Sequence, residues 1–315
     1  MKSKTTLAAA FGLALATLLG APTTASADGP HGHRPGRIVF GAETSNGTQL
    51  WTIRPNGTHL RQITHVDGDA VNPDWSPNGR RLTFEWDTPD TGRVAVMDAD
   101  GDRLRTLPPS GCAQGQPVFT ADARRIIYER FDCATDDSLF AQRVQGGHEK
   151  RVTTAAPDGH TDPNVSPDGR HLSFIRVDDG VEFHQALTVA KIDGTHQHDL
   201  LPPSWDIAVK HAWSPDSKRL VFTRDADPDP VTGVLAANVG TVRADGRHVR
   251  MLTHYTGGRL SAFAGSYSPD GRHIVFRLQD NKSGKSALWV MRTDGSHRRQ
   301  IFSRDGVRPR FIDWG

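Results

Sequence analysis

Histidine and carboxylate side chains have the greatest capacity for chemistry in this sequence, which contains 15 histidines, 36 aspartates and glutamates, and two cysteines. His196 and His198 lie two residues apart, which places both imidazoles on one face of a strand at a spacing that zinc can use. They fall on the outer strand of a repeat, where a wet polar face is expected, while His31 and His33 fall in a Gly/Pro-rich tail. We therefore predict no metal site at either pair and no cofactor.

Two acidic segments have the clustered oxygens that calcium prefers. Residues 98–102, Asp-Ala-Asp-Gly-Asp, resemble the start of a calcium loop, but no glutamate follows at the twelfth position, and the Asp-Gly pair recurs at the same offset in other repeats. We interpret this segment as a turn. Asp225, Asp227 and Asp229 form a denser group in a long loop, where calcium binding is the alternative to an extended, solvated loop.

The motifs of common catalytic sites are missing from the sequence, which contains no Gly-x-Ser-x-Gly, no His-Glu-x-x-His and no phosphate-binding glycine loop. We therefore predict no catalytic residues and interpret the dispersed histidines as ordinary polar surface residues. The alternative is a hydrolase or lyase that acts on an extracellular polymer through His160, Asp162 or His211, with or without a divalent metal. A stoichiometric transition metal in the purified protein would favour this alternative.

These residues are carried on a repeated block that opens with Ser-Pro-Asp or a variant of it. Five copies read WSPNGRRLTF, FTADARRIIY, VSPDGRHLSF, WSPDSKRLVF and YSPDGRHIVF. Intervals of 44, 46, 48, 54 and 44 residues separate equivalent positions, counted from Asn72, Gln116, Asp162, Lys210, Ala264 and Arg308. Such intervals indicate four-stranded propeller blades rather than helical solenoid units.

Each copy contains the same four predicted strands and two kinds of turn. An aromatic-centred strand leads into a Pro-Asx-Gly turn, an alternating Leu-x-Phe strand returns, and two further strands are joined by an Asp-Gly turn. Proline sets φ at the start of a turn and Asx-Gly tolerates positive φ, so both turns favour hairpins. Period-two alternation in segments such as 93–97 and 287–291 is typical of half-buried strands.

The two ends of the repeat region each supply part of one blade. From Arg37 the sequence RIVF matches a second strand without a first one before it, and residues 309–314 match a first strand with nothing after it. A C-terminal innermost strand that completes an N-terminal blade would leave no exposed edge in the ring. We therefore predict an all-β, six-bladed propeller of four-stranded blades, with the first blade closed by the C-terminal strand.

The blocks resemble the Trp-Ser-Pro-Asp-Gly-Arg-x-Leu-x-Phe signature of the TolB-like propeller repeats, and LWVMRTDGS and LTVAKIDGT resemble the second half of that signature. The resemblance extends over about residues 37 to 315 and implies a propeller. TolB, after which the group is named, carries an α/β domain before its propeller and binds a peptidoglycan-associated lipoprotein at the propeller. The blade pattern here starts at Arg37, so we expect no such domain, and the third copy departs from the signature at residues 119–123.

Residues 1–27 have the pattern of a cleavable signal peptide, with two lysines, an apolar stretch over residues 7–21 and a final Ala-Ser-Ala. We expect residues 28–36 to form a flexible tail, residues 37–315 to form the propeller, and the protein to be secreted or periplasmic. The apolar stretch is too short to span a bilayer stably, and no later one is apolar enough. Cleavage leaves 38 − 2 = 36 basic residues against 36 acidic ones, so we predict no nucleic-acid partner.

Cys112 and Cys133 are the only two cysteines. An exported protein meets an oxidising compartment, where an even cysteine count favours pairing. The two residues lie about equally far on either side of a predicted hairpin turn near Asp122, so they face each other across an antiparallel pair. We predict a disulfide between them, and the alternative is a reactive or metal-binding thiol pair.

The mouth of the central channel is the predicted functional site, because the innermost strands of all blades begin there and a concave polar surface is the default place for a ligand. The residues expected around this opening are Asn72, Asp74, Gln116, Asp162, Asn164, Lys210, His211, Arg308 and Arg310. Their mixture of both charges with amides suits a peptide, a loop or a sugar better than a bare ion. We predict that the channel mouth binds a protein or a cell-envelope component; the alternative is that these residues only hydrate the channel.

Overall fold

The computed structural model describes residues 36–108, 111–131, 137–154, 159–178, 184–205, 207–225 and 236–315, which form six four-stranded antiparallel sheets. We number these blades from the N-terminus. From the innermost strand outward, blade 1 consists of β24 (Arg308–Trp314), β1 (Ile38–Thr44), β2 (Gly47–Ile53) and β3 (Arg61–Gln62), and blade 2 of β4 (Asp69–Trp75), β5 (Arg81–Asp87), β6 (Gly92–Asp98) and β7 (Arg105–Thr106). Blade 3 consists of β8 (Ala113–Phe119), β9 (Arg125–Phe131), β10 (Leu139–Arg143) and β11 (Lys150–Arg151), and blade 4 of β12 (Gly159–Val165), β13 (His171–Asp178), β14 (His184–Lys191) and β15 (His198–Asp199). Blade 5 consists of β16 (Ile207–Trp213), β17 (Arg219–Asp225), β18 (Ala237–Arg243) and β19 (Arg250–Met251), and blade 6 of β20 (Leu260–Tyr267), β21 (His273–Asp280), β22 (Ser286–Arg292) and β23 (Arg299–Ser303). A short 3-10 helix, η1 (Pro203–Trp205), precedes β16.

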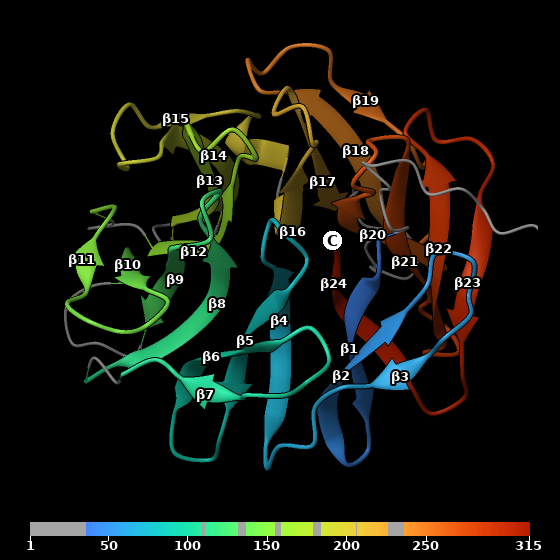
Figure 1. Ribbon diagram of the computed structural model, residues 1–315. Coiled ribbons are helices and arrows are strands. Elements are labelled where there is room, and N and C mark those ends of the chain that lie inside the picture. Colours follow the sequence, from blue (N-terminus) through green and yellow to red (C-terminus); the bar gives the residue numbers. More distant parts are fainter. Residues whose placement is uncertain are drawn as a thin grey trace, which may run out of the picture. The chain divides into compact units, whose positions relative to one another are not determined.

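The six innermost strands form a closed ring around the axis of the propeller, where the sequence predicts the channel. Strands β4, β8, β12, β16, β20 and β24 contact one another in that cyclic order, and β24 contacts β4 in turn (Figure 1). The C-terminal strand β24 pairs antiparallel with β1, from Ile38 opposite Trp314 to Glu43 opposite Arg308. The predicted six-bladed fold, closed by the C-terminal strand, is therefore confirmed.

The turn between the first and second strand is built the same way in every Ser-Pro-Asp copy that the structure describes. In blade 4, Ser166 Oγ donates to Asp168 Oδ1 (2.6 Å) and accepts the His171 N–H (2.9 Å). The divergent third copy keeps this geometry, because Thr120 Oγ1 donates to Asp122 Oδ1 (2.6 Å) and accepts the Arg125 N–H (3.1 Å). A hydroxyl followed two residues later by a carboxylate is thus the essential chemistry of the turn.

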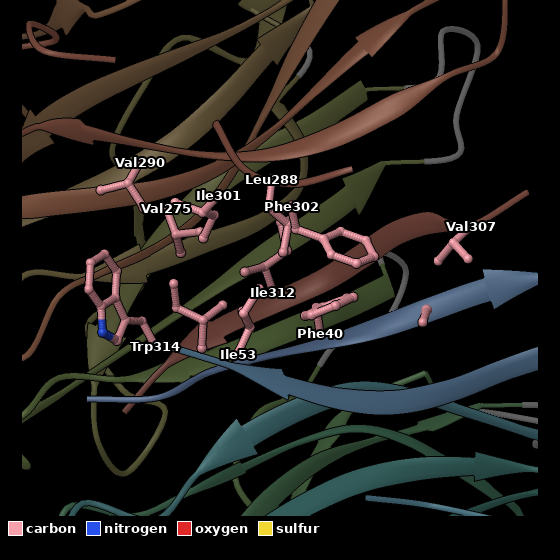
Figure 2. Close-up of a cluster of buried hydrophobic side chains, with 12 residues drawn as sticks. Phe40, Ile53, Val275, Leu288, Val290, Ile301, Phe302, Val307, Ile312 and Trp314 are labelled. Atoms are coloured by element: carbon pink, nitrogen blue, oxygen red, sulfur yellow. The ribbon is translucent and has the colours of Figure 1, made fainter. Parts of the chain in front are cut away.

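The hydrophobic core lies between neighbouring blades. Figure 2 shows the cluster shared by blades 6 and 1, which includes Ile312 and Trp314 and in which the rings of Phe40 and Phe302 lie 5.0 Å apart. Phe40 is the phenylalanine of the Leu-x-Phe pattern and is fully buried. Truncating such a side chain to alanine typically costs about 3–5 kcal/mol of stability.

A second contact recurs across the blade boundaries. The residue that opens or immediately precedes a second strand lies over the aromatic residue that ends the next blade's first strand: Arg37 lies 5.6 Å from the Trp75 ring, and the His171 ring 6.0 Å from that of Trp213. The arginine contact is a cation–π pair, which contributes on the order of 0.5–1 kcal/mol at an exposed site, and the histidine contact is a ring stack.

Several sequence predictions fall outside the residues that the structure describes. These are the signal peptide, nearly all of the expected tail, His31 and His33, Cys133, Asp227 and Asp229. Within the described ranges, no helix has both the length and the apolar character needed to cross a bilayer.

Candidate ligand-binding channel

A β-bulge with left-handed backbone occurs at equivalent positions of five innermost strands. The φ angles there are 48°, 48°, 48°, 83° and 51° at Asn72, Gln116, Asp162, Lys210 and Phe311. A non-glycine residue in this conformation costs on the order of 1–3 kcal/mol, so surrounding contacts must hold it. Each bulge also interrupts the pairing with the second strand, which leaves a backbone N–H free for another acceptor.

Side-chain oxygens of the preceding blade accept these N–H groups. Gln116 N–H donates to Glu85 Oε2 (2.9 Å). In β20 the equivalent residue, Ala264, lacks the positive φ, and its N–H likewise donates to Thr223 Oγ1 (2.8 Å). Glu85 and Thr223 both follow the phenylalanine of a Leu-x-Phe strand. In blade 4 that position holds Ile175, which has no acceptor. There Asp162 takes over the role and accepts the N–H of the next blade's bulge residue.

The structure places Phe311, not Arg308, at the position equivalent to Asn72. Trp314 pairs with Ile38 as Trp75 pairs with Leu82, and the bulge residue lies three positions before each tryptophan. The interval counted in the sequence was therefore wrong by three residues at the last copy. Arg308 instead opens β24, where it pairs with Glu43 near the channel mouth.

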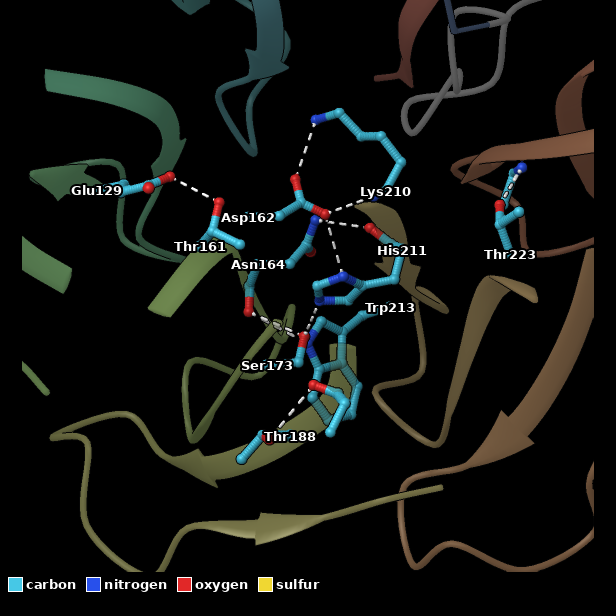
Figure 3. A network of polar contacts seen from close by, with 12 residues as sticks. Glu129, Thr161, Asp162, Asn164, Ser173, Thr188, Lys210, His211, Trp213 and Thr223 are labelled. Carbon is cyan, nitrogen blue, oxygen red and sulfur yellow. Dashed lines mark hydrogen bonds and ion pairs between the residues drawn. The ribbon is translucent and has the colours of Figure 1, made fainter. Parts of the chain in front are cut away.

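Asp162 is the centre of a polar network between blades 4 and 5 (Figure 3). Its Oδ2 accepts the Lys210 N–H (2.7 Å) and lies 3.2 Å from His211 Nδ1, while its Oδ1 lies 3.5 Å from Lys210 Nζ. Asn164 joins the network by donating from Nδ2 to the His211 carbonyl (3.1 Å). Burial alone would raise the pKa of Asp162, but Lys210 and His211 outweigh it and lower that pKa to about 2.

His211 also lies between a carboxylate and a hydroxyl, in the order found in hydrolytic triads. One ring nitrogen, Nε2, is 2.8 Å from Ser173 Oγ, and the other faces Asp162. However, the side chain of His211 and the whole of Ser173 are 0% exposed, so no substrate can reach the hydroxyl. His160 is also buried and lies 2.8 Å from Thr153 Oγ1. Both histidines are buried and contact other side chains of the protein, so we interpret them as structural residues.

Acidic side chains gather in the sector of the channel formed by blades 2 and 3. Asn72 Nδ2 donates to Glu85 Oε2 (2.7 Å), the same oxygen that holds Gln116. Burial raises the pKa of Glu129 to about 8, and the nearby carboxylates of Glu85, Asp137 and Asp162 add to this rise. The Thr161 hydroxyl, which donates to Glu129 Oε2 (2.7 Å), acts in the opposite direction. With a pKa of about 8, Glu129 is mostly protonated at neutral pH and would ionise more readily beside a positively charged group.

Asp74, two residues after Asn72 on β4, also lies in surroundings that disfavour an ionised carboxylate. Burial and the neighbouring Asp313 raise the pKa of Asp74 well above its usual range. Both carboxylates nonetheless have backbone partners in the next blade, since Asp74 Oδ2 accepts the Phe119 N–H (2.8 Å) and Asp313 Oδ2 accepts the Trp75 N–H (2.9 Å). Asp74 therefore has a role in joining blades 2 and 3.

Basic side chains gather in the sector formed by blades 6 and 1. Arg308 and Arg310 both pair with Glu43, the latter at 3.1 Å. Arg277 lies 3.9 Å over the Phe263 ring, and burial together with Arg310 lowers its pKa to about 10. Three guanidinium groups thus face one carboxylate. Glu43 and Arg308 also line a cleft of about 600 Å³ with Lys285, Arg304, Asp305 and several serine hydroxyls.

The structure divides the predicted mouth residues into separate groups. Asp162, Asn164, Lys210 and His211 share one network, Asn72 and Gln116 share Glu85, Arg308 and Arg310 share Glu43, and Asp74 lies beside Asp313. Sequence reasoning missed the charged residues of the second strands. A usable signal was present, because the residue after the buried phenylalanine or tyrosine of each second strand varies from copy to copy: it is Gly41, Glu85, Glu129, Ile175, Thr223 and Arg277.

The other chemical candidates have local explanations where the structure describes them. Asp98 accepts from Arg103 Nε (2.7 Å) and its carbonyl accepts the Gly101 N–H (2.9 Å), as expected for a turn. His196 has a φ of 58°, and its ring lies 3.0 Å from Thr195 Oγ1. No three His, Cys, Asp or Glu side chains in the described ranges are placed to hold a metal ion. Cys112 Sγ accepts from Arg130 (2.8 Å), and its predicted pairing with Cys133 stays a prediction.

Comparison with known protein families gives one match, to the family described as the TolB beta propeller domain, over residues 20–201. Among curated relatives, the Tol-Pal system protein TolB of Nitratidesulfovibrio vulgaris is 24% identical over 129 residues, which cover 41% of this chain and 28% of that protein. The chain spans between a quarter and about a third of the length of the curated relatives it matches.

Solved structures agree in fold over most of the chain. TolB from Acinetobacter baumannii superposes with a TM-score of 0.68 at 16% identity, covering 89% of this chain and 66% of that one. The hydrazine synthase of Kuenenia stuttgartiensis superposes with a TM-score of 0.71 at 13% identity, covering 89% of this chain and 47% of that one. Likeness at such identities shows the propeller fold alone, since one fold hosts many functions.

Proposed function

The chain belongs to the TolB beta-propeller domain family, and from this we propose that it is an exported, non-catalytic propeller that binds a protein or another cell-envelope component at its channel mouth. The curated relatives are named for a Tol-Pal system, which supports an envelope partner. The signal-peptide pattern of residues 1–27 supports export.

The observation that carries the proposal is the separation of charge around the channel. The acidic sector, in blades 2 and 3, contains Glu85 and Glu129, and the basic sector, in blades 6 and 1, contains Arg277, Arg308 and Arg310. A partner with a positive and a negative group at a matching separation would satisfy both sectors. A peptide loop has such groups, and complementary charge gives it orientation as well as affinity.

Burial of the polar side chains that resemble a hydrolytic site supports a non-catalytic role. Ser173 and His211 have the spacing of a nucleophile and its base, yet the surrounding strands cover both. The polymer-cleaving alternative needs one of His160, Asp162 and His211 to reach a substrate, and all three are buried. No observation on the described residues favours that alternative.

The test is capture of partners from envelope extract by the immobilised mature protein, followed by a binding titration of each captured partner. Arg308→Glu reverses a charge at the mouth on a side chain that is 54% exposed, so we expect folding to persist. If the partner desolvates this contact, affinity should fall roughly 30-fold, which corresponds to about 2 kcal/mol, the scale of an interface hot spot.

Arg80→Glu is the matched control. Arg80 is an exposed arginine in the turn after β4, at the end of the propeller opposite the mouth. It should leave both affinity and melting temperature nearly unchanged. Loss of binding in the Arg80 variant with full binding in the Arg308 variant would move the recognition surface to the other face and overturn the proposal.

A further inference from the structure

The outer wall of the propeller has positive charge concentrated on one side. In each blade, a nine-residue segment covers the turn after the third strand and the first two residues of the fourth. In blades 5, 6 and 1 these segments are residues 243–251, 292–300 and 54–62, which together hold eight arginines and two aspartates, a net charge of 8 − 2 = +6. In blades 2, 3 and 4 the equivalent residues 98–106, 143–151 and 191–199 hold six basic and six acidic residues. The balanced charge of the whole sequence therefore conceals a basic half of the wall.

Contacts across the blade boundaries join the three basic segments into one surface, which we call the basic wall. Arg250 of blade 5 donates to the Asp294 carbonyl of blade 6 (3.0 Å), and Arg299 of blade 6 donates to the Pro55 carbonyl of blade 1 (2.9 Å). Strands β19, β23 and β3 accordingly follow one another along one side of the ring (Figure 1). The arginines of the basic wall are Arg54, Arg61, Arg243, Arg247, Arg250, Arg292, Arg298 and Arg299.

The arginines of the basic wall are accessible to a ligand, because every one of them is exposed. A guanidinium has several N–H donors, and a contact to one carbonyl leaves most of them unused. Arg54, Arg247 and Arg292, one in each of the three blades, make no hydrogen bond or ion pair through the guanidinium within the described part of the chain. These three groups are therefore the first candidates for direct contact with a ligand.

The aspartates near the basic wall do not cancel its charge. Asp245 and Asp294 accept the N–H groups of Arg247 (3.1 Å) and Ser296 (2.9 Å) within their own turns. The first turns of the same three blades, residues 36–37, 214–219 and 268–273, add two aspartates and four arginines or lysines, so the sign of the charge stays positive. Like charges gathered in this way repel one another and oppose folding. A ligand with negative charge would relieve the repulsion.

The residue type and the shape of the basic wall both favour a flexible, linear polyanion. All of its basic residues other than histidine are arginines, and the planar guanidinium matches phosphate and carboxylate groups with paired donors, whereas an ammonium group does not. The wall is the outside of a ring and extends over three blades (Figure 1). A flat bilayer would contact only a small part of such a wall, while a flexible chain can follow it.

We propose that the basic wall of blades 5, 6 and 1 binds a linear polymer that carries an anionic oxygen group on each repeating unit. The anionic groups are phosphates or carboxylates, since arginine pairs with both. Arg54, Arg247 and Arg292 contact them directly, and the arginines that bridge the blades add the donors that their carbonyl contacts leave unused. The basic wall lies on the outermost strands and contains none of the predicted mouth residues, so this binding is separate from the proposed function.

Fluorescence anisotropy with end-labelled polymers and the purified protein tests this proposal. Inorganic polyphosphate supplies repeating phosphates, polygalacturonate supplies repeating carboxylates, and dextran is the neutral control. Vesicles of phosphatidylglycerol, measured by co-sedimentation, supply a flat anionic surface. We expect saturable binding of one or both polyanions, no binding of dextran, and an affinity for the polyanions that falls as the salt concentration is raised from about 50 to about 200 mM.

Two triple variants that remove the same amount of charge locate the binding surface. The wall variant combines Arg54→Gln, Arg247→Gln and Arg292→Gln. It should bind the polyanion roughly tenfold or more weakly, and the slope of log affinity against log salt should become shallower by about 2, at about 0.7 for each lost contact. The matched control, in the equivalent segments of blades 3 and 4, combines Arg143→Gln, Lys150→Gln and Lys191→Gln. It should change neither quantity, and neither variant should melt below the wild-type temperature.

The source of the anionic groups follows from the two polymers. Binding of polyphosphate alone would assign a phosphate polymer, and binding of polygalacturonate alone a carboxylate polymer. Three results would overturn the proposal: no saturable binding of either polymer, an equal loss of binding in the wall variant and the matched control, or vesicles bound more tightly than both polymers. Wild-type affinity in the wall variant would overturn it as well.

Discussion

Replacing Asp162 by asparagine should destabilise the propeller through loss of charge alone. Asparagine keeps the shape of the side chain and an oxygen that can accept the Lys210 N–H. It removes the negative charge that lies 3.5 Å from Lys210 Nζ and 3.2 Å from His211 Nδ1. The network would then hold a half-buried lysine without its counter-ion, and removing one partner is the costly way to break such a pair.

The magnitude follows from the lowered pKa of Asp162. With a folded pKa of about 2 and an unfolded value of about 3.9, the ionised carboxylate contributes roughly 2–3 kcal/mol at neutral pH. A lowered acid pKa means that this contribution is complete above about pH 4 and disappears as the pH falls toward 2. About half of it is gone at pH 3.

Urea unfolding of the wild type and of Asp162→Asn at pH 7, 5, 4 and 3 measures this dependence. The difference in free energy of unfolding should be roughly 2–3 kcal/mol at pH 7 and should shrink by about half at pH 3. Asp168→Asn is the control, because that carboxylate is partly exposed and sits in a turn, where its loss should cost less. A difference of equal size at pH 7 and pH 3 would mean that packing, and not charge, causes the loss, and the reasoning would fail.

Three further predictions concern the closing strand β24, the buried Glu129 and the two cysteines. Deleting residues 309–315 should cause aggregation or a large drop in melting temperature, because β1 would lose its β24 partner and expose an edge; a monomeric truncation of unchanged stability would contradict this. The melting temperature of Glu129→Gln relative to the wild type should be higher at pH 9 than at pH 5. A folded pKa of about 8 makes the wild type lose stability as the pH rises from about 4 to 8, and the variant lacks this loss. A difference in melting temperature that did not change with pH would contradict this. Cys112 and Cys133 should form one disulfide worth roughly 3 kcal/mol in secreted material, and mass spectrometry that finds two free thiols there would refute it.

The fold was predictable because its information is local. A hydroxyl two residues before an aspartate or asparagine closes these first turns, and this pair is visible in the sequence even where proline and glycine are absent, as at Thr120 and Asp122. The closing strand was also predictable, since its tryptophan matches that of the other first strands. The count to Arg308 was wrong by three residues because blade lengths vary and the bulge leaves no signature in the residues, with asparagine, glutamine, aspartate, lysine and phenylalanine all adopting it.

The channel was predictable only in part, for a different reason. Residues of the first strands were expected at the mouth because those strands are innermost, but the second strands also direct charged side chains toward the bulges of the next blade. Glu85 holds Gln116 and Glu129 accepts from Thr161 across such a boundary. These contacts join residues more than thirty positions apart, so period-two alternation identifies the face of the strand without identifying its partner.

The direction of each pKa shift separates structural charges from charges that are free to recognise a partner. The pKa of Asp162 is lowered, which means that the protein itself stabilises the ionised form, and Lys210 and His211 are the groups that do so. Glu129 and Arg277 have pKa values shifted against their charged forms, mainly by burial, so each would gain from a group of opposite charge. Groups with pKa values shifted in this way are more often found at functional sites than in purely structural networks. For this reason Glu129 and Arg277, in the two sectors of opposite charge, are better candidates for contact with a partner than Asp162, although Asp162 is the residue that the repeat makes most prominent.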